Sequence, residues 1–313
     1  DHPGARRDET RQGQEEEEIA ALAPRDIELR PIRETEFTAA AVLFYDALTA
    51  LTERNNMPAP HRDIALVERG YRHVARTGIF RVAANDGRLV SLACAIVRGT
   101  QWFLSGFWTD PARRVQGIGG PLLREVWEEG QRHGTRAHYV WASIDHAALA
   151  SYMKLGMLPG SQLFTFAGPP SVPAEPSSLR TEPLTAERVA TLDRELVGVR
   201  RDDDHAYWLD GLGTRGVVVT EGSEVVGYYH RHRGFIGPVG WSRDDVAKDV
   251  LALAIRDAAT DATDVQLTIP GMDHAALRFA FACGLRLIRT SHLLWSEPIG
   301  HLERYIPSGP LLF

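Results

Sequence analysis

Cysteine, methionine and long apolar runs are all scarce in this sequence. Of its 313 residues, two are cysteine and four are methionine. Cys94 and Cys283 lack the paired spacing of a zinc site or a redox motif, so we expect both to be small buried side chains. No run approaches the roughly 20 apolar residues of a membrane span, and the charged N-terminus lacks the apolar core of a signal peptide. The sequence therefore predicts no metal site, no membrane partner and a cytoplasmic location.

Beyond residue 24 the chain also carries little net charge. The formal net charge is −6, but residues 1–24 hold seven acidic and three basic side chains, which accounts for −4 and leaves −2 for the rest. This small remainder gives no support to a nucleic-acid partner. We interpret residues 1–24, with glutamate at all of 15–18, as a disordered acidic tail.

An internal repeat divides the remaining chain into two related parts. Residues 145–149 (Asp-His-Ala-Ala-Leu) recur at 273–277, an offset of 128, and the same offset carries Gly156 onto Gly284. Between the copies, residues 168–176 include four prolines, which cannot sustain a helix or a central strand. We predict a first repeat at 25–168, a linker at 169–178, a second repeat at 179–297 and a tail at 298–313.

Periodicity within the first repeat predicts a mixed α/β layer. Apolar spacings of three or four predict helices over 37–48 and 64–74. Strands are expected over 79–84, 88–97, 102–108, 137–143 and 161–167. Asn85, Asp86 and Gly87 are typical of a hairpin turn, and two more helices are expected over 119–133 and between Asp145 and Gly156. This order favours an α/β (α+β) class with a mostly antiparallel mixed sheet, and not an alternating dinucleotide-binding fold.

Residues 109–123 carry the strongest chemical signal. They read Thr-Asp-Pro-Ala-Arg-Arg-Val-Gln-Gly-Ile-Gly-Gly-Pro-Leu-Leu, between a predicted strand and an amphipathic helix. Glycines let the backbone approach a ligand closely, and successive amides at the positive end of a helix dipole can hold an anion such as pyrophosphate. A tight strand-to-helix connection without a ligand would have the same composition, so the loop alone leaves both interpretations open.

Two motifs together resemble the GNAT superfamily of acetyl-CoA-dependent N-acetyltransferases. Residues 114–119 (Arg-Val-Gln-Gly-Ile-Gly) are similar to that family's Arg/Gln-x-x-Gly-x-Gly/Ala pyrophosphate loop. Residues 145–148 and 151–157 follow at the expected distance and are similar to the family's Asn-x-x-Ala and Leu-Tyr-x-Lys-x-Gly-Phe motifs. The resemblance implies two tandem GNAT-like domains, of which the second is an eroded copy.

The resemblance also implies a reaction and a set of site residues. Acetyl-CoA, which leaves as coenzyme A, would be the cosubstrate, and a primary amine of a small molecule would attack it directly. The cofactor would contact Trp108, Thr109, Arg114, Val115, Gln116, Gly117, Gly119 and Gly120. Tyr152 would act as the general acid for the departing thiolate. Asp145 stands where the family has a cofactor-contacting Asn; it lacks the amide's donors but can still cap its helix.

The general base is not identified by the sequence. The strand over 102–108 has no titratable carboxylate or imidazole. His138 on the neighbouring strand is a candidate, and a water chain or a residue from the second repeat is an equal alternative. A noncatalytic coenzyme A or acyl-CoA binding module, and a transferase of longer acyl groups, are the rival functions.

The second repeat has lost the residues that would carry the reaction. The offset of 128 places Ser242, Asp245, Ala247 and Lys248 opposite Arg114, Gly117, Gly119 and Gly120, and it places Ala280 opposite Tyr152. Loss of both motif glycines and the phenol predicts an inactive copy.

Three other features remain outside the motifs. The acidic run at 202–204 with His205 is expected to be solvated, and His230 with His232 lacks further ligands, so neither predicts a metal. The apolar tail at 305–313 is expected to dock on its own chain or on a partner subunit, which leaves a homodimer open.

Overall fold

The computed structural model describes residues 27–173, 178–211 and 213–313. The predicted acidic tail and the middle of the predicted linker lie outside these residues. The first repeat forms β1 (Ile27–Pro31), α2 (Phe37–Arg54), α3 (Ile64–Thr77), β2 (Gly78–Asn85), β3 (Arg88–Arg98), β4 (Gln101–Thr109), α4 (Gly119–Arg132), β5 (Ala137–Ala142), α5 (His146–Lys154) and β6 (Leu158–Gly168).

The second repeat and the tail form a similar succession. These elements are β7 (Arg180–Pro183), α6 (Ala186–Val197), α7 (Asp202–Leu209), β8 (Thr214–Glu221), β9 (Glu224–His232), β10 (Phe235–Trp241), α8 (Ala247–Ala258), β11 (Val265–Pro270), α9 (His274–Ala282), β12 (Arg286–Trp295) and β13 (Tyr305–Ile306). Short 3-10 turns are η1 (Glu34–Glu36), η2 (Pro111–Arg113), η3 (Asp244–Val246) and η4 (Leu302–Arg304).

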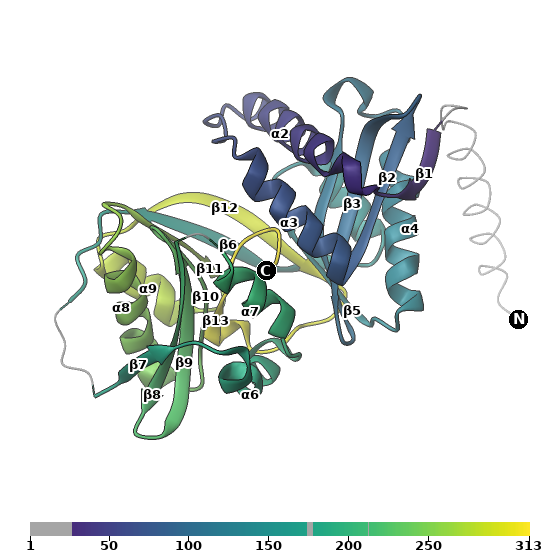
Figure 1. The fold of residues 1–313 in the computed structure, drawn as a ribbon. Coiled ribbons are helices and arrows are strands. Elements are labelled where there is room, and N and C mark those ends of the chain that lie inside the picture. The colour runs from purple at the N-terminus through teal and green to yellow at the C-terminus, as the bar shows by residue number, and fades with distance from the viewer. Residues whose placement is uncertain (1–26, 174–177, 212) are drawn as a thin grey trace, which may run out of the picture. The chain divides into compact units, whose positions relative to one another are not determined.

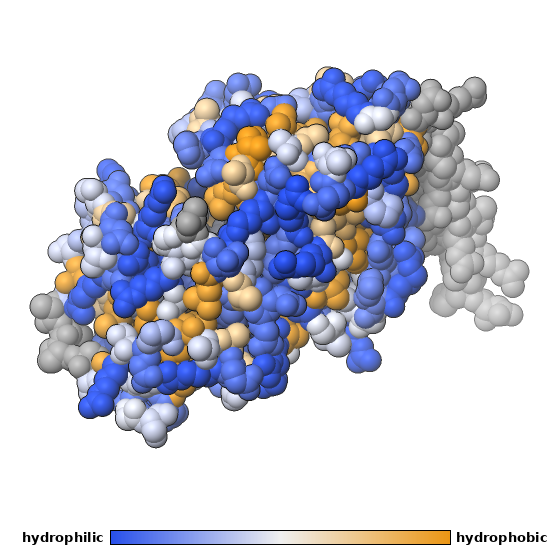
Figure 2. All heavy atoms as spheres, viewed as in Figure 1, coloured by the Kyte–Doolittle hydropathy of each residue, from blue (hydrophilic) through white to orange (hydrophobic). Residues whose placement is uncertain are grey.

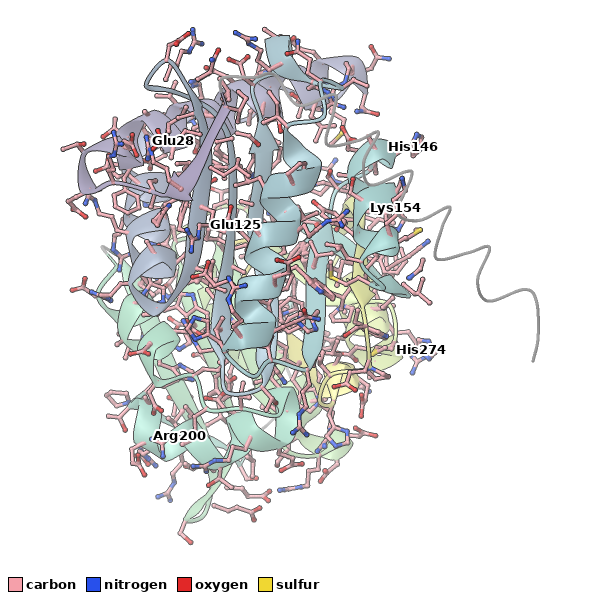
Figure 3. The ribbon with its side chains drawn as sticks, turned by 90° about the vertical axis from the view of Figure 1, so that its right-hand side faces the viewer. Glu28, Glu125, His146, Lys154, Arg200 and His274 are labelled. Atoms are coloured by element: carbon pink, nitrogen blue, oxygen red, sulfur yellow. The ribbon has the colours of Figure 1, made fainter. Side chains whose placement is uncertain are left out.

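The structure confirms the predicted correspondence between the repeats in their later elements. α8, β11, α9 and β12 each begin 128 residues after α4, β5, α5 and β6. Figure 3 labels His146 and His274, the first residues of α5 and α9. The helices are capped alike: the Asp145 carboxylate accepts from the amides of the second and third residues of α5, and Asp273 accepts from Ala276.

The chain forms two compact units that do not coincide with the repeats. Unit 1 holds the chain up to Ala95 together with Gly106–Glu129, and unit 2 holds Ile96–Ser105 together with Gly130–Phe313. The chain passes between the units within β3, β4 and α4. The predicted domain boundaries stay a prediction.

In unit 1, helices cover both faces of a sheet of order β1-β2-β3-β4. Successive residues of β2 show this arrangement, because neighbouring side chains in a strand point to opposite faces. Phe80 makes edge contacts with Phe37 of α2 and Tyr71 of α3, whereas Arg81 pairs with Glu125 of α4 at 3.3 Å. Figure 3 shows α4, with Glu125, running across the sheet. α4 therefore lies on the face opposite α2 and α3.

The predicted hairpin turn of unit 1 is confirmed, and one strand was missed. Asp86 and Gly87 have φ of 50° and 78°, the left-handed pair that a two-residue hairpin requires. β1 was not predicted. It pairs antiparallel with β2, Ile27 opposite Asn85, and its five residues end at a proline, which leaves too short a pattern for a sequence-based prediction.

In unit 2, the two repeats exchange their last strands. The strand order is β4-β5-β12-β6-β11-β10-β9-β8-β7, in which the part of β4 up to Ser105 pairs parallel with β5. β12, from the second repeat, pairs antiparallel with β5, and β6, from the first repeat, pairs antiparallel with β11. β12 and β6 pair with each other between them. Each repeat thus completes the sheet of the other.

Burial corrects one prediction about polar residues and confirms another about cysteine. Asp204 and His205 are fully buried, so the expectation of a solvated acidic run is wrong for these two residues. They belong to the first turn of α7, where Arg98 and Arg201 pair with the Asp204 carboxylate. Both cysteines are free and buried, as predicted.

The visible surface is mostly hydrophilic, and the described helices are not of the membrane-spanning kind. On the face that Figure 2 displays, hydrophilic side chains predominate and hydrophobic ones are scattered among them. Within the described ranges, no helix has both the length and the apolar character needed to cross a bilayer.

Candidate functional site

The loop between β4 and α4 has an unusual backbone. Residues 110–118 form this connection, and Asp110 begins it by accepting a hydrogen bond from the Ala112 amide at 2.9 Å. Val115 and Gly117 adopt φ of 62° and 77°. A left-handed conformation is strained for a β-branched residue, at a cost on the order of 1–3 kcal/mol. Val115 is also fully exposed, so no burial of its side chain offsets the strain.

Two glycines at the start of α4 have different surroundings. A Cβ atom on Gly119 would lie 2.8 Å from Cζ of Phe107, so the ring of Phe107 requires a glycine there. A Cβ atom on Gly120 would meet nothing within 4 Å. Gly119 therefore lets the helix start close to β4, and Gly120 leaves the space before the helix open.

The amides of this loop are available to a ligand. Among the residues that the structure describes, none accepts a hydrogen bond from a main-chain N–H of residues 115–120. The first amides of α4 point out of its N-terminus, where the helix dipole adds positive potential. All of these residues except Ile118 are at least partly exposed. This loop, which we call the cradle (residues 115–120), fits a diphosphate, because several unpaired donors can converge on one anion.

Three basic side chains, Arg88, Arg113 and Arg114, precede the cradle in the sequence. Arg113 donates to the Asn85 side chain at 3.2 Å, which ties the loop to the hairpin turn. Arg88 pairs with Asp110 at 3.3 Å, and Arg114 is half-buried. These contacts hold the loop from the β3 side and leave the amides of the cradle unaffected.

The end of β4 presents selected main-chain groups to its free edge. The Asp110 amide donates to the Val90 carbonyl oxygen of β3 at 2.8 Å. The main-chain N–H and C=O groups of Trp108, two residues earlier, therefore also point toward β3. Neighbouring residues of a strand present their main-chain groups to opposite edges. The groups of Thr109 and Phe107 therefore face away from β3. This geometry favours Thr109 over Trp108 as a main-chain contact and adds Phe107, which the alternation of the strand could have revealed from the sequence.

Tyr152 and Asp145 lie together on α5, in unit 2. Asp145 caps the helix, and its carboxylate lies near enough to Tyr152 to influence that phenol. Tyr152 is 6% exposed. Burial is the main cause that raises the pKa of the phenol well above its usual value, and the Asp145 charge adds to it. The phenol stays protonated over the physiological range and can donate a hydrogen bond.

His138 is buried at the start of β5 and uses both ring nitrogens. Nδ1 lies 2.9 Å from the Arg136 carbonyl oxygen and Nε2 lies 3.1 Å from the Thr135 hydroxyl. The carbonyl requires a proton on Nδ1, so Nε2 accepts from the hydroxyl of Thr135. Burial lowers the pKa of the imidazole, which agrees with this neutral tautomer. The geometry gives His138 a structural environment and does not favour it as a base.

Two further histidines, His205 and His230, form a buried hydrogen-bonded chain with Asp193 in unit 2. His205 Nε2 lies 2.9 Å from the Asp193 carboxylate, and His205 Nδ1 lies 2.9 Å from His230 Nε2. Tyr228 donates to the same carboxylate at 2.7 Å. Within the described part of the chain, no group of three or more His, Cys, Asp or Glu side chains could hold a metal ion.

Comparison with known proteins finds one family model that matches the middle of the chain. The sequence model of the acetyltransferase (GNAT) family matches residues 43–157. The matched segment includes the cradle, the end of β4 and α5. No curated protein matches the sequence.

Solved structures share the fold at low sequence identity. A candidate acetyltransferase from Pyrococcus horikoshii has a TM-score of 0.75 at 15% identity and covers 93% of this chain and 97% of its own. A GCN5-related N-acetyltransferase from Sphaerobacter thermophilus has a TM-score of 0.61 at 18% identity, with 90% and 99% covered. A tandem GNAT protein from the clavulanic acid biosynthesis pathway has a TM-score of 0.59 at 15% identity, with 87% and 99% covered. These matches confirm the predicted fold class, a mixed sheet flanked by helices in two GNAT-like halves.

Proposed function

We propose that the protein transfers the acetyl group of acetyl-CoA to a primary amine of a small molecule, because the sequence model of the GNAT acetyltransferase family matches the segment at 43–157. The working site would belong to the first repeat. The observation that carries this proposal is the cradle, whose main-chain donors at 115–120 have no acceptor among the described residues. A cation would be repelled by such donors and a neutral acceptor would gain less from them, whereas a diphosphate can accept several charge-assisted hydrogen bonds.

The cradle and β4 have distinct tasks in this proposal. Bound acetyl-CoA would supply an acyl group activated as a thioester. The amides of 115–120 hold the diphosphate, and the free-edge groups of Thr109 and Phe107 orient the arm that follows it. Because all of these contacts come from the main chain, they depend on backbone conformation more than on side-chain identity. The strained φ of Val115 is consistent with that demand.

Tyr152 would assist the departure of the thiolate. A protonated phenol can donate a hydrogen bond to sulfur and deliver its proton as the carbon–sulfur bond breaks. The raised pKa of Tyr152 guarantees the protonated form but weakens it as an acid. We therefore assign its main contribution to a hydrogen bond that strengthens as negative charge develops on sulfur.

The proton of the attacking ammonium is assigned to water. His138 has both nitrogens engaged by Arg136 and Thr135, and its lowered pKa makes it a weak acceptor at neutral pH. This assignment predicts that the rate rises with pH until the amine itself is deprotonated. A His138→Gln variant should keep that profile.

The test of the function is thiol release in the presence of amines. Purified protein is incubated with acetyl-CoA and, separately, with amino sugars, amino acids, aminoglycosides and polyamines. We expect stoichiometric thiol release and acetylated product for at least one class. Binding of coenzyme A without release for any amine would contradict the enzyme and favour a binding module. Faster release from longer acyl donors would change the acyl group and leave the cradle's role intact.

A further inference from the structure

The end of the chain lies within the sheet of unit 2. Residues 301–313, here called the C-terminal segment, include β13, which pairs antiparallel with β10, Ile306 opposite Val239. β10 and β11 are parallel, and within the described residues they pair at one position, Phe235 with Gln266. β13 also lies beside β11. The segment thus occupies the space that opens between two parallel strands.

The C-terminal segment fits this space closely. Tyr305 and Ile306 are fully buried. A Cβ atom on Gly237 of β10 would lie 2.6 Å from the Pro307 carbonyl oxygen and 3.1 Å from Cα of Ser308. Backbone atoms cannot yield as a flexible side chain can, so only glycine at 237 permits this approach.

A buried arginine fastens the far end of the segment. Arg201 donates to the carbonyl oxygens of Leu312 and Phe313 and to the Tyr305 hydroxyl. Its charge is balanced by Asp204 at 3.0 Å. A buried guanidinium with this many partners is costly to release, because loss of the segment would leave its donors unpaired.

The terminal aromatic ring reaches strands of the first repeat within the same unit. The ring centroid of Phe313 lies 5.4 Å from that of Phe103 on β4 and 5.2 Å from that of Tyr139 on β5. Phe313 is 1% exposed. The C-terminal segment therefore joins β10 and β11 to β4 and β5, and it resolves the earlier alternative in favour of docking on its own chain.

β13 covers the edge of β10 that corresponds to the free edge of β4. β10 precedes α8 as β4 precedes α4, and each follows an antiparallel neighbour, β9 or β3. On β4, the edge away from β3 carries the groups of Thr109 and Phe107 that we assign to the cofactor. On β10, the edge away from β9 is hydrogen-bonded to β13.

The connection that would hold a diphosphate is also engaged by the chain itself. Residues 242–246 join β10 to α8. The Ser242 amide donates to the Val226 carbonyl oxygen at 2.9 Å, and Arg304 of the C-terminal segment donates to the Ser242 carbonyl oxygen. The Val246 amide donates to the Arg243 carbonyl oxygen at 3.4 Å.

Carboxyl groups lie in and near this connection, including Asp245, which pairs with Arg243. Asp273, which caps α9, is 2% exposed, and burial together with the Asp244 and Glu303 charges raises its pKa to about 7. Its Oδ2 atom has no partner among the described residues. A diphosphate brought here would meet carboxylates where the first repeat offers amides.

We propose that the second repeat permanently binds residues 301–313 of its own chain at the strand edge that the first repeat offers to coenzyme A, so that each chain binds one coenzyme A. The inference rests on the proposed function of the first repeat for the identity of the ligand. The occupied edge of β10 rests on the contacts of the C-terminal segment alone.

Hydrogen exchange of the full chain tests the occupant directly. We expect the amides of Tyr305 and Ile306 to exchange as slowly as the amides of β10, both without ligand and with saturating coenzyme A. Fast exchange in the free protein, or exchange that coenzyme A accelerates at least tenfold, would overturn the proposal, because the segment would then be displaceable.

A matched pair of glycine variants sharpens this readout. Gly237→Ala places a methyl group against the segment backbone and should accelerate exchange over 305–308 at least tenfold. Gly309→Ala changes a residue of similar φ, 157°, with nothing within 4 Å of the added atom, and should leave exchange over 305–308 unchanged. Equal exchange in the two variants would overturn the proposal. If Gly237→Ala does not fold, the wild-type pattern decides.

Calorimetric titration of the full chain with coenzyme A separates the two proposals. One site per chain is expected, and two sites would overturn the inference. No binding at all would contradict the proposed function instead. In that case the exchange of Tyr305 and Ile306 still decides whether the C-terminal segment fills the second repeat.

Discussion

The connection from β4 to α4 and the connection from β10 to α8 differ in the main-chain groups that they offer to a ligand. The first runs over residues 110–118 and the second over 242–246, so the second is four residues shorter. The helices after them keep their offset of 128. The first connection has left-handed residues at Val115 and Gly117, and the amides of the cradle have no acceptor among the described residues. In the second connection the Ser242 and Val246 amides donate to carbonyl oxygens of the chain itself. Packing of the helix thus survives the loss of the loop's chemistry, because the two depend on different atoms.

The shortening also refines the alignment of the repeats. A constant offset of 128 places Ser242 opposite Arg114, but β10 ends 132 residues after β4. The missing residues therefore fall within the connection at 110–118, which includes most of the cradle, and a deletion there can remove several donors at once. Substitution of single glycines would have removed them one by one.

The largest expected effect tests the comparison of α5 with α9, where Ala280 replaces Tyr152. A Tyr152→Phe variant should lose at least about a hundredfold in kcat, the usual contribution of a hydrogen bond to a charge that develops in the transition state, and retain affinity for coenzyme A. Thiol release and a calorimetric titration measure the two quantities. Tyr229→Phe is the control, because that phenol binds Asp257 in the second repeat; its rate should match wild type. A Tyr152→Phe enzyme with unchanged kcat would remove the phenol from the mechanism.

A smaller effect is expected when Gly117 of the first connection is replaced by aspartate, the residue found at the equivalent position, Asp245, of the second connection. Gly117→Asp places a carboxylate beside the proposed diphosphate and should weaken coenzyme A binding at least tenfold, about 1.4 kcal/mol. Asp tolerates the left-handed conformation of this position better than most residues. Gly134→Asp introduces the same residue at a similar φ, 80°, beyond the other end of α4. Equal affinities of the two variants would mean that the cradle does not meet the phosphates.

The smallest effect concerns the two caps, Asp145 and Asp273. Burial raises the pKa of Asp273 to about 7 from an ordinary 3.8, so the folded chain holds a proton there that the unfolded chain releases. The wild-type free energy of unfolding should therefore fall as pH rises from about 4 to 7. Asp273→Asn keeps the cap and removes this dependence, with a gain of about 1 kcal/mol at pH 8 after the cost of an unpaired amide.

Asp145 supplies the comparison for that measurement. It is half exposed, and an Asp145→Asn variant should retain the fall in the free energy of unfolding between about pH 4 and 7 that we assign to Asp273. A pH profile of Asp273→Asn that is parallel to that of wild type would show that the Asp273 carboxyl is not the source of the dependence.

Local features were predictable because they depend on neighbouring residues. The hairpin at Asp86 and Gly87, the Asp145 cap and the amphipathic helices all follow from short-range sterics and hydrogen bonds. The cradle was found in the same way, since its glycines and the following helix are contiguous.

Features that depend on distant partners were not predictable. Nothing in β6 or β12 alone indicates that each pairs with the other repeat, because strand pairing joins residues far apart in the sequence. Asp204 was expected in solvent because its neighbours are acidic, and its burial depends on Arg98, more than a hundred residues earlier. The direction in which the main-chain groups of Thr109 point could be found only from the pairing of β4 with β3.

The exchange of β6 and β12 has a consequence for the heredity of this protein. A gene that lost its second half would leave the β5 edge without β12, and such an edge pairs readily with other chains. Natural selection on the first half therefore also preserves the strands of the second. The hydrogen bonds of β12 with β5 and of β6 with β11 thus keep the two halves of the gene together.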